Sequence, residues 1–322
     1  MAAEKDPPIR IGISACLLGR EVRYDGGHKR DGFLVDTFGA YVEWVTFCPE
    51  VELGLGTPRD PIRLVREKRG ADVRLVVPKT GRDLTDNMRA FAKRRVAKLR
   101  ADDLCGFVLK KNSPSCGMAR VKVYDHNGAP SPEGVGLFAA AVMERFPNLP
   151  VEEEGRLSDP RLRENFVERV FAYRRLRTLF EGRFRPGALV KFHTAHKLAL
   201  LAHSTAAYTE LGRLVARARE VPPAGLRDRY EAGFMQAMKK IATPRQHTNV
   251  LQHMAGYFKK DLGEAEKREL GAIIEDYRRG LVPLVVPLTL IRHHVRRHQV
   301  EYLEGQTYLQ PHPRELMLRN HV

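Results

Sequence analysis

The sequence predicts two structural regions: an α/β amino-terminal region with a mainly parallel sheet, and an all-α helical carboxy-terminal region. At 322 residues the chain is longer than one hydrophobic core normally supports. Its first half alternates strand-like and helix-like patterns, as α/β layers do. Its second half is amphipathic with helical periodicity almost throughout. We therefore expect two domains, residues 1–154 and 155–322, joined in a stretch rich in proline, glycine and charge between Phe146 and Glu164.

The amino-terminal region shows apolar residues at every second position in several short stretches, which indicates strands. The expected strands are residues 9–15, 41–47, 73–77, 106–110 and 120–124. Residues 84–99 instead repeat apolar side chains with helical spacing, with basic residues on the opposite face, and residues 134–146 also indicate a helix. This order of elements favours a parallel sheet covered by helices.

The carboxy-terminal region carries clear helix-start signals. Asp159 precedes Pro160 and Thr243 precedes Pro244, so in each case an N-cap residue is followed by proline at the first helical position. Further amphipathic stretches cover residues 188–204, 205–219, 226–241, 264–279 and 288–303. About seven helices joined by short loops predict a helical bundle.

The charge is strongly positive and unevenly distributed. Lys and Arg number 55 against 39 Asp and Glu, a net charge of +16 and a sequence pI near 9.9. Residues 1–152 contribute +5 and residues 153–322 contribute +11. This excess favours a polyanionic partner, nucleic acid first and an anionic membrane second.

Targeting and membrane signals are weak. The segment from Met1 to Pro8 has no apolar core typical of a signal peptide. The longest apolar stretch, residues 280–291, is interrupted by two prolines and is too short to span a membrane. Four cysteines are too few for a disulfide scaffold. We expect a cytoplasmic protein with no membrane contact.

Three of the four cysteines occupy equivalent positions. Cys16 and Cys48 directly follow expected strands, and Cys116 lies in the loop after another. Because ligands of parallel sheets bind at the carboxyl ends of the strands, the three thiols are expected to converge there. Cys105 begins a strand at the opposite end and is expected to be a buried apolar residue. Thiolates favour zinc or an iron–sulfur cluster, and three ligands leave one position open. The spacing alone is equally compatible with three buried cysteines and no metal.

Several motifs in one order resemble a known family. The amino-terminal motifs are Ser14-Ala-Cys-Leu-Leu-Gly, Val22-Arg-Tyr-Asp-Gly, Cys48-Pro-Glu, Gly54-Leu-Gly-Thr-Pro-Arg59 and Lys111-Asn-Ser-Pro-Ser-Cys-Gly117. Together they resemble the bacterial thiouracil desulfidase (TudS-like) family over residues 9–155. The second half, through residues 191–197 and 243–253, resembles the YbgA-like helical domain. The fusion is similar to the RudS-type desulfidases, which remove sulfur from 4-thiouridine.

The resemblance implies a 4Fe–4S cluster held by Cys16, Cys48 and Cys116, with one open iron. The open iron would capture the substrate sulfur as a Lewis acid while water attacks the ring carbon, with no net redox change. Ser113 is the expected residue for positioning water or relaying its proton, a role that the resemblance supports. Glu50 is the nearest carboxylate to the expected cluster in sequence. It is either a catalytic group or a helix-start carboxylate.

The basic helical region is expected to bind tRNA through its phosphates. The expected RNA-binding residues are Arg174, Arg175, Lys191, Lys239, Lys240, Arg245, Lys259 and Lys260. For any single pair, a solvated helix face is the alternative. The histidine pairs His193/His196 and His294/His298 lack the carboxylate usual in zinc motifs, so packing or RNA contact is expected of them.

Three functions remain open on these grounds. The first is a desulfidase acting on 4-thiouridine in tRNA. The second is a desulfidase of free thiouracil or thionucleosides whose helical domain has an unrelated task. The third is a nucleic-acid-binding protein with a structural metal site, which the absence of an obvious fourth ligand disfavours.

Overall fold

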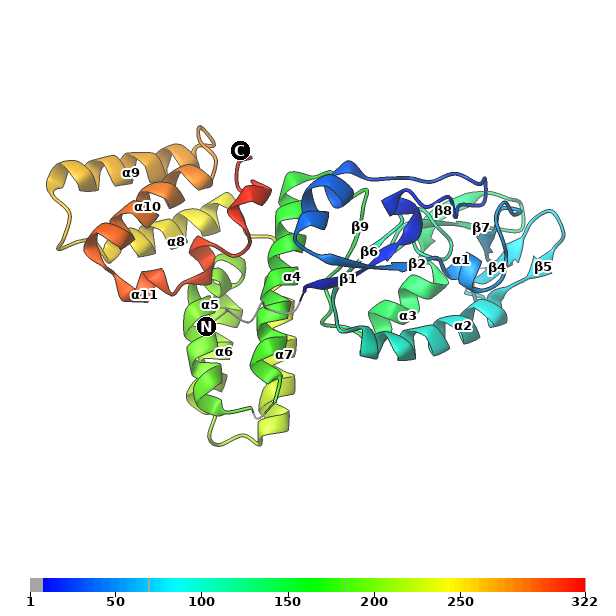
Figure 1. Cartoon of the computed structure of the whole chain (residues 1–322), viewed down its shortest axis with the longest axis horizontal. Coiled ribbons are helices and arrows are strands. Elements are labelled where there is room, and N and C mark those ends of the chain that lie inside the picture. Colours follow the sequence, from blue (N-terminus) through cyan, green and yellow to red (C-terminus); the bar gives the residue numbers. More distant parts are fainter. Residues whose placement is uncertain (1–7, 69, 183, 322) are drawn as a thin grey trace, which may run out of the picture. The chain divides into compact units, whose positions relative to one another are not determined.

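The computed structural model describes residues 8–68, 70–182 and 184–321 (Figure 1). The chain forms two compact units, Met1–Ser158 and Asp159–Val322. The first unit extends past residue 154 because Val151–Glu153 form a strand of its sheet and residues up to 157 continue to bond to that strand. From the sequence, no signal peptide is expected between Met1 and Pro8. Residues 1–7 of this segment lie outside the described residues.

The first unit is built on a four-stranded, fully parallel sheet. Its strands are β1 (Arg10–Ser14), β2 (Glu43–Phe47), β6 (Leu104–Leu109) and β9 (Val151–Glu153). Their order is β2-β1-β6-β9, with β1 hydrogen-bonded in parallel to β2 on one side and to β6 on the other. From β1 the chain adds β2 on one side of the sheet and then β6 and β9 on the other, so the strand order reverses between β1 and β6. This is the kind of switch point at which open α/β sheets bind ligands.

Helices α2 (Thr85–Lys98) and α3 (Leu137–Arg145) pack side by side on this unit (Figure 1). The core beneath them is aromatic. The rings of Phe47 and Phe107, from β2 and β6, lie 5.2 Å apart, and Phe138 of α3 packs within 6.3 Å of both. Gly12 leaves room for the Phe107 ring, since a Cβ there would lie 2.5 Å from it. The sheet is thereby fixed against its helices by large buried rings.

A second sheet of mixed direction adjoins the first. Its strands, in the order β5-β4-β3-β7-β8, are Arg82–Asp83, Arg74–Val77, Arg63–Val65, Val121–Tyr124 and Pro130–Gly134. Only the β3–β7 pair is parallel. The expected strands 73–77 and 120–124 belong here and not to the main sheet. Alternating burial identifies a strand, but it does not say which strand lies beside it.

The second unit consists mainly of helices, as predicted. They are α4 (Pro160–Phe180), α5 (Pro186–His203), α6 (Thr205–Ala216), α7 (Pro223–Met238), α8 (Pro244–Gly256), α9 (Glu264–Arg278), α10 (Val285–His298) and α11 (Glu301–Glu304). The predicted caps are present. Asp159 accepts hydrogen bonds from the N–H groups of Arg161 and Leu162, and Thr243 forms a capping box with Gln246.

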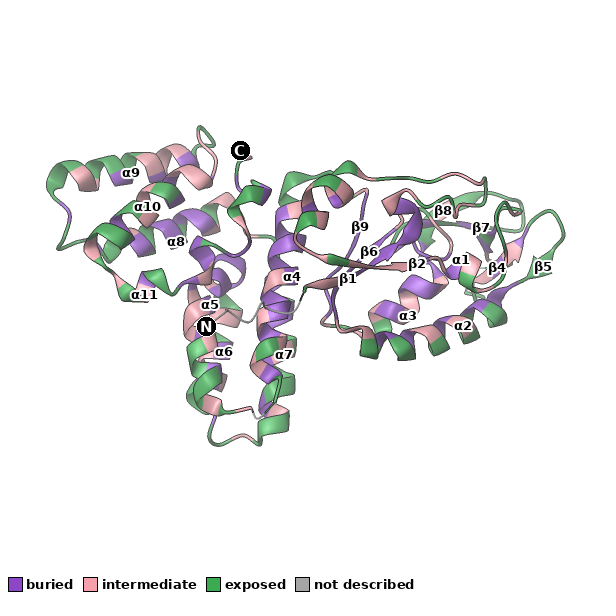
Figure 2. Cartoon of the chain, viewed as in Figure 1, coloured by how far each residue is buried: buried purple, intermediate pink, exposed green. Residues whose placement is uncertain are grey.

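The helices form two groups. Helices α4 to α7 pack together, α8 packs with α9 and α10, and α5 contacts α8. Buried residues are dense along α4, which is the longest helix described (Figure 2). The predicted α/β region followed by a helical region is confirmed.

The helical unit also buries neutral histidines. His193 shares a hydrogen bond of 3.1 Å with the Tyr230 hydroxyl, and His196 bonds the Phe192 carbonyl at 2.8 Å. Burial lowers the pKa of His193 to about 4 and that of His196 to about 3. Burial likewise lowers the pKa of His247 to about 3 and that of His312 to about 4. These side chains pack inside the bundle.

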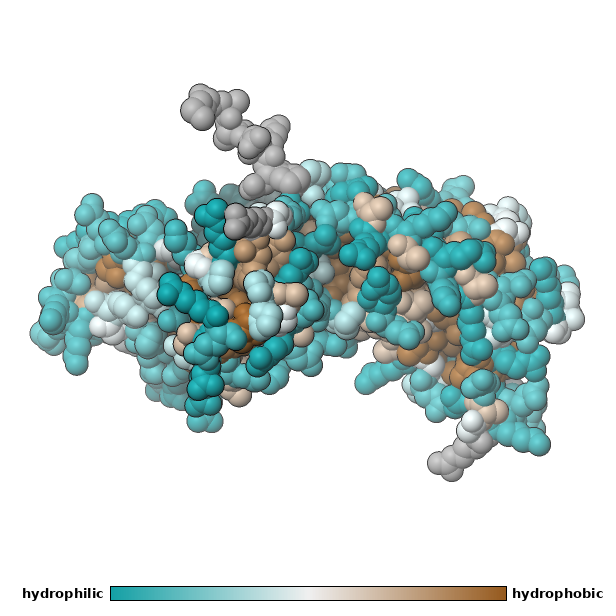
Figure 3. Space-filling model, turned by 90° about the horizontal axis from the view of Figure 1, so that it is seen from below, coloured by the Kyte–Doolittle hydropathy of each residue, from teal (hydrophilic) through white to brown (hydrophobic). Residues whose placement is uncertain are grey.

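Within the described residues, no helix combines the length and apolar character needed to cross a bilayer. On the face drawn in Figure 3, hydrophilic side chains predominate and apolar side chains form scattered patches between them. The described surface thus shows no broad apolar belt on this face.

The buried histidines predict that acid destabilises the helical unit. Between about pH 4 and 6.5 the unfolded chain protonates His193, His196, His247 and His312 while the folded chain keeps them neutral. Stability is therefore fully present above pH 6.5 and falls as the pH drops. His203, whose pKa is raised by Glu168 against the effect of burial, acts in the opposite direction.

We expect the thermal midpoint of the helical unit, followed by circular dichroism, to fall between pH 7 and pH 5. His196→Gln removes one titrating group and flattens this dependence. A midpoint that stays constant over this pH range would contradict the assignment of neutral buried histidines.

Candidate active site

A cavity of about 390 Å³ lies at the carboxyl ends of β1, β2 and β6. Cys16, Cys48 and Cys116 all contribute to its wall. The structure thus brings together the three cysteines that the strand pattern selects. Cys105 lies near the start of β6 with 1% of its surface exposed, away from this cavity wall.

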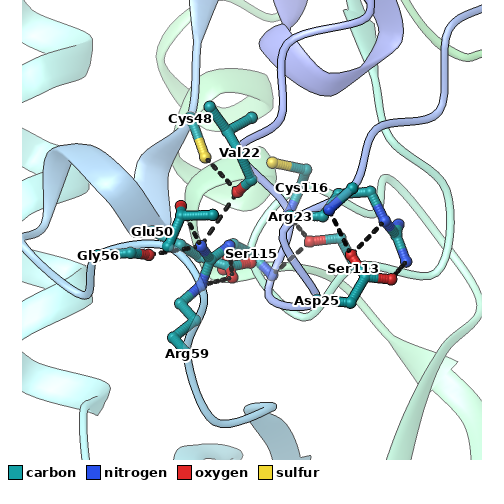
Figure 4. Close-up of polar contacts among 12 residues, drawn as sticks. Val22, Arg23, Asp25, Cys48, Glu50, Gly56, Arg59, Ser113, Ser115 and Cys116 are labelled. Carbon is teal, nitrogen blue, oxygen red and sulfur yellow. Dashed lines mark hydrogen bonds and ion pairs between the residues drawn. The ribbon is translucent and has the colours of Figure 1, made fainter.

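Cys16 lies in a short turn, Cys48 at a helix start and Cys116 in a loop. Cys16 belongs to a 3-10 turn, Ala15–Leu18, that continues directly from β1. Cys48 is the N-cap residue of α1 (Pro49–Glu52), and its Sγ lies 3.7 Å from the Val22 carbonyl oxygen (Figure 4). Cys116 is 6% exposed. Its loop is closed by a hydrogen bond from the Gly117 N–H to the Ser113 carbonyl, 2.8 Å.

The environment of the thiols disfavours their charged forms. Burial raises the pKa of Cys16 to about 11 and raises those of Cys48 and Cys116 as well. Negative charge on Cys16 or Cys48 raises the pKa of Cys116 further, so the three thiols interact electrostatically. A hydrogen bond with Ser14 acts against that rise. Three thiols on one cavity wall, two of them buried and Cys48 partly exposed, are a donor set that a soft metal would deprotonate and occupy.

Among the described residues, no three His, Cys, Asp or Glu side chains are arranged around a point to hold a single metal ion. A four-iron cluster is a larger body whose corners bind separate thiolates, and cysteine thiolates are its usual ligands. Three thiols spread over one cavity wall, each from a different loop, fit such a cluster better than a lone ion.

Ser113 lies at the base of the Cys116 loop and also lines the cavity. Its Oγ accepts hydrogen bonds from the N–H groups of Ser115 at 3.2 Å and Cys116 at 3.1 Å. A hydroxyl that accepts from two donors keeps its own proton to donate. Ser113 therefore shapes the loop and retains one donor.

Glu50 is held in a buried ion pair with Arg59 (Figure 4). Its Oε2 accepts hydrogen bonds from Nε and Nη2 of Arg59, at 2.9 and 2.6 Å, and its Oε1 accepts one from Ser115 Oγ at 3.0 Å. The side chains of Arg59 and Glu50 are only 7% and 13% exposed. Glu50 stands in the first turn of α1, as the helix-start interpretation predicts, and it also lines the cavity.

Arg59 extends this pair into a network. Its Nη1 donates to the carbonyls of Val22 at 3.0 Å and Gly56 at 2.8 Å. The same Val22 carbonyl faces the thiol of Cys48. The Glu50–Arg59 pair thus connects the Cys48 turn, the 22–24 segment and, through Ser115, the Cys116 loop.

Two carboxylates at the end of the first predicted domain, Glu153 and Glu154, anchor the Cys116 loop. Glu153 accepts a hydrogen bond of 2.6 Å from the N–H of Met118, and Glu154 accepts one of 2.7 Å from the N–H of Lys111. Glu154 also forms an ion pair with Lys110. Both carboxylates are less than 10% exposed. They clamp the two ends of the loop that carries Cys116.

Sequence reasoning missed Gly136, Arg59 and Ser115. A Cβ at Gly136 would lie 2.5 Å from the backbone carbonyl of Ser115 and 2.8 Å from the Cys116 nitrogen. Arg59 and Ser115 do occur inside the quoted motifs, but their pairing with Glu50 spans nine and 65 residues. No local pattern signals contacts of that separation.

The remaining cavity wall is strongly basic. It includes the cationic residues Arg23, Lys29, Arg63, Lys110, Lys111 and Lys122. Two of these lie over aromatic rings that also line the cavity, Arg23 at 5.4 Å from the Tyr24 centroid and Arg63 at 4.7 Å from that of Tyr124. Tyr24 itself is 44% exposed. The wall therefore offers both cations and ring faces.

The structure separates the predicted RNA-binding residues into two groups. Arg174 is buried and pairs with Glu181 at 3.4 Å, and Arg175 donates to the carbonyl of Pro311. These two guanidinium groups bind partners within the helical unit, because most residues of helix α4 are buried. The exposed members are Lys191, Lys239, Lys240, Arg245, Lys259 and Lys260.

The first unit is therefore an α/β protein with a thiol-lined ligand cavity at its switch point. The family model for 2-thiouracil desulfurase matches residues 11–154, and that for a protein of unknown function, DUF1722, matches residues 197–313. The chain belongs to the 2-thiouracil desulfurase family and carries a DUF1722 (YbgA-like) domain after it.

Each of the following relatives matches only part of this chain. The uncharacterized protein YbgA of Escherichia coli (strain K12) is 36% identical over 163 residues, covering 50% of this chain and 95% of YbgA. The uncharacterized protein YbbK of Bacillus subtilis (strain 168) is 35% identical over 114 residues, covering 33% of this chain and 72% of YbbK. The solved structure of the [4Fe-4S]-dependent thiouracil desulfidase TudS is 33% identical. It covers 47% of this chain and 93% of its own, with a TM-score of 0.37.

The close approach at Gly136 predicts that Gly136→Ala displaces the Cys116 loop. The new methyl group meets backbone atoms, which do not yield as a flexible side chain does. We expect a loss of about 1–3 kcal/mol in unfolding free energy. We also expect faster alkylation of Cys116 by iodoacetamide, followed by mass spectrometry. Gly32→Ala, whose Cβ would meet only the Asp36 carboxylate at 3.6 Å, is the matched control. Equal alkylation rates in the two variants would refute this role.

The buried pair predicts a characteristic double-variant result. Arg59→Ala leaves the Glu50 carboxylate buried without its partner, which should cost about 3–5 kcal/mol in urea unfolding. Replacing both residues, Glu50→Gln with Arg59→Met, removes both charges and should cost less than the single change. If the double variant is as unstable as Arg59→Ala or worse, Arg59 does not act mainly by neutralising Glu50.

Proposed function

We propose that this chain is an iron–sulfur-dependent desulfidase that converts 4-thiouridine, as a residue of tRNA, into uridine. One observation carries the proposal: three thiols line a cavity at the switch point whose remaining wall is basic. The thiols account for cofactor binding, and the cations account for a polyanionic substrate. Membership of the 2-thiouracil desulfurase family supports the reaction class.

Cys16, Cys48 and Cys116 would hold a [4Fe–4S] cluster through three of its irons. When bound, the cluster supplies a Lewis-acidic iron for the thiocarbonyl sulfur. The overall change replaces C=S by C=O, consumes one water and releases one hydrogen sulfide. No electron is gained or lost, so the reaction needs no external oxidant or reductant.

Two side chains of the cavity have defined tasks in this proposal. Ser113 keeps a hydroxyl proton after accepting two backbone N–H groups, so it can orient the attacking water or pass on its proton. Glu50 acts as a positioning residue, because both of its oxygens are engaged by Arg59 and Ser115. It keeps the Cys48 and Cys116 elements in register.

The basic wall favours a nucleotide of RNA over a free thiobase. A free thiobase carries no phosphate, so it gives Lys29, Arg63 and Lys122 nothing to neutralise. An RNA segment brings a phosphate for each nucleotide, and phosphate contacts dominate RNA affinity. The exposed ring of Tyr24 offers a surface on which a neighbouring base can stack. We infer that the thiolated base leaves its stack before reaction, since Cys16 and Cys116 are buried and Cys48 is only partly exposed.

The direct test is nucleoside mass spectrometry of bulk bacterial tRNA before and after anaerobic incubation with cluster-reconstituted protein. We expect 4-thiouridine to disappear and uridine to rise by the same amount. Cys116→Ser should abolish this conversion while the helical unit keeps its circular dichroism signal. Unchanged tRNA together with turnover of free 4-thiouracil would replace tRNA by the free base as substrate. No turnover of either would overturn desulfidation.

The basic wall makes a separate prediction. Lys29→Glu or Lys122→Glu should lower kcat/KM for thiolated tRNA at least tenfold and leave that for free 4-thiouracil within twofold. Lys93→Glu changes the charge equally on the exposed face of α2, outside the cavity wall, and serves as control. If all three variants lose the same fraction of tRNA activity, only the net charge matters and the cavity wall has no special part.

A further inference from the structure

A second cavity, of about 230 Å³, lies within the helical unit. One stripe of α4 lines it with Arg161, Glu164, Asn165 and Glu168, residues that share a helix face by their spacing. The start of α8, the end of α9 and the carboxy-terminal segment complete the wall. Part of its wall, from His203 to Leu284, lies in the region that the DUF1722 model matches.

The interior of this cavity is charged. Glu168 is 3% exposed, and its Oε2 lies 3.5 Å from His203 Nε2 and 3.8 Å from Arg319 Nη2. Arg319 also pairs with Glu164 at 2.8 Å. The other oxygen of Glu168, Oε1, has no hydrogen-bond partner in the described part of the chain. A buried carboxylate oxygen without a donor is costly, so this position is suited to a ligand that brings an N–H group.

The walls and the mouth differ from the interior. Tyr277 and His247 form a corner of two rings, with centroids 6.4 Å apart, and burial keeps the pKa of His247 low and its ring neutral. Arg161, Arg278 and Arg279 are exposed at the mouth. Arg278 and Arg279 pair with Glu275 at 2.6 and 3.0 Å on the surface, contacts weak enough to be exchanged for a phosphate.

We propose that this cavity binds a nucleotide, with an N–H group of the base directed to Glu168, the base against Tyr277 and the phosphate at the arginines of the mouth. The proposal goes beyond desulfidation and does not require the cysteine site. A metal ion is a poorer occupant, because no group of three His, Cys, Asp or Glu residues in the described chain is arranged to hold one. The nucleotide is either free or one residue of a bound RNA, and the two sources are separable by experiment.

The test uses the full chain and two binding measurements. Isothermal titration calorimetry measures the four 5′-ribonucleoside monophosphates, and fluorescence anisotropy measures labelled tRNA. Ala242→Trp adds a large side chain to the cavity wall and keeps every charged residue, and Arg161→Ala removes an exposed cation of the mouth. Arg219→Ala, an exposed arginine outside the cavity, is the control.

We expect Ala242→Trp to weaken binding at least tenfold and Arg161→Ala at least threefold, with Arg219→Ala unchanged. An effect on the monophosphates assigns a free nucleotide, and an effect on tRNA alone assigns a nucleotide of RNA. If Ala242→Trp lowers the thermal midpoint, its weaker binding can result from unfolding, and the binding measured for Arg161→Ala then tests the proposal. Binding of both probes within twofold of wild type in the cavity variants overturns the proposal. Turnover of free 4-thiouracil, measured in parallel, reports on the cysteine site alone.

Discussion

The ion pair between Glu50 and Arg59 is the interaction on which the cysteine site depends. It forms part of the cavity wall, with both side chains largely withdrawn from solvent. A buried pair of this kind gains little net stability over an apolar replacement, but breaking it is costly. Its contacts run to the Cys48 turn, to the Val22 carbonyl and to Ser115 beside Cys116. The pair therefore fixes the relation between two loops that no strand pairing connects directly.

The sheet provides the coarser part of the same arrangement. Parallel pairing of β1 with both β2 and β6 brings the ends of three strands to one edge, and each strand is followed by a cysteine-bearing segment. The longest of these segments, after β6, would be the least constrained without further contacts. Glu153 and Glu154 at the end of β9 supply them by accepting backbone N–H groups at both ends of the loop. A strand at the sheet edge thus works mainly as an anchor for a neighbouring loop.

The positions of Cys16, Cys48 and Cys116 were predictable because strand periodicity and the end of each strand are local properties of the sequence. Cys105 could be separated from them because it lies near the start of a strand and not after its end. The second sheet was not predictable, because β3 and β7 pair across more than fifty residues. The contacts of Glu153 and Glu154 were not predictable, since charge normally indicates solvent and only tertiary partners explain their burial. Ser113 and Glu50 both line the cavity, whereas the partners that hold Glu50 lie outside any local pattern.

The helical unit shows why net charge and surface charge must be counted separately. Arg319 is almost fully buried and compensates Glu164 and Glu168, while Arg174 and Arg175 bond to Glu181 and to a carbonyl. These arginines add to the excess of +11 in residues 153–322 without offering a free cation to a phosphate. What remains for a polyanion is the set of exposed cations, which includes lysines such as Lys191 and Lys239, surface arginines such as Arg245, and the arginines at the mouth of the second cavity. Polyanion binding by this unit is therefore expected to depend on its exposed cations, and neutralising its buried arginines should alter stability before it alters affinity.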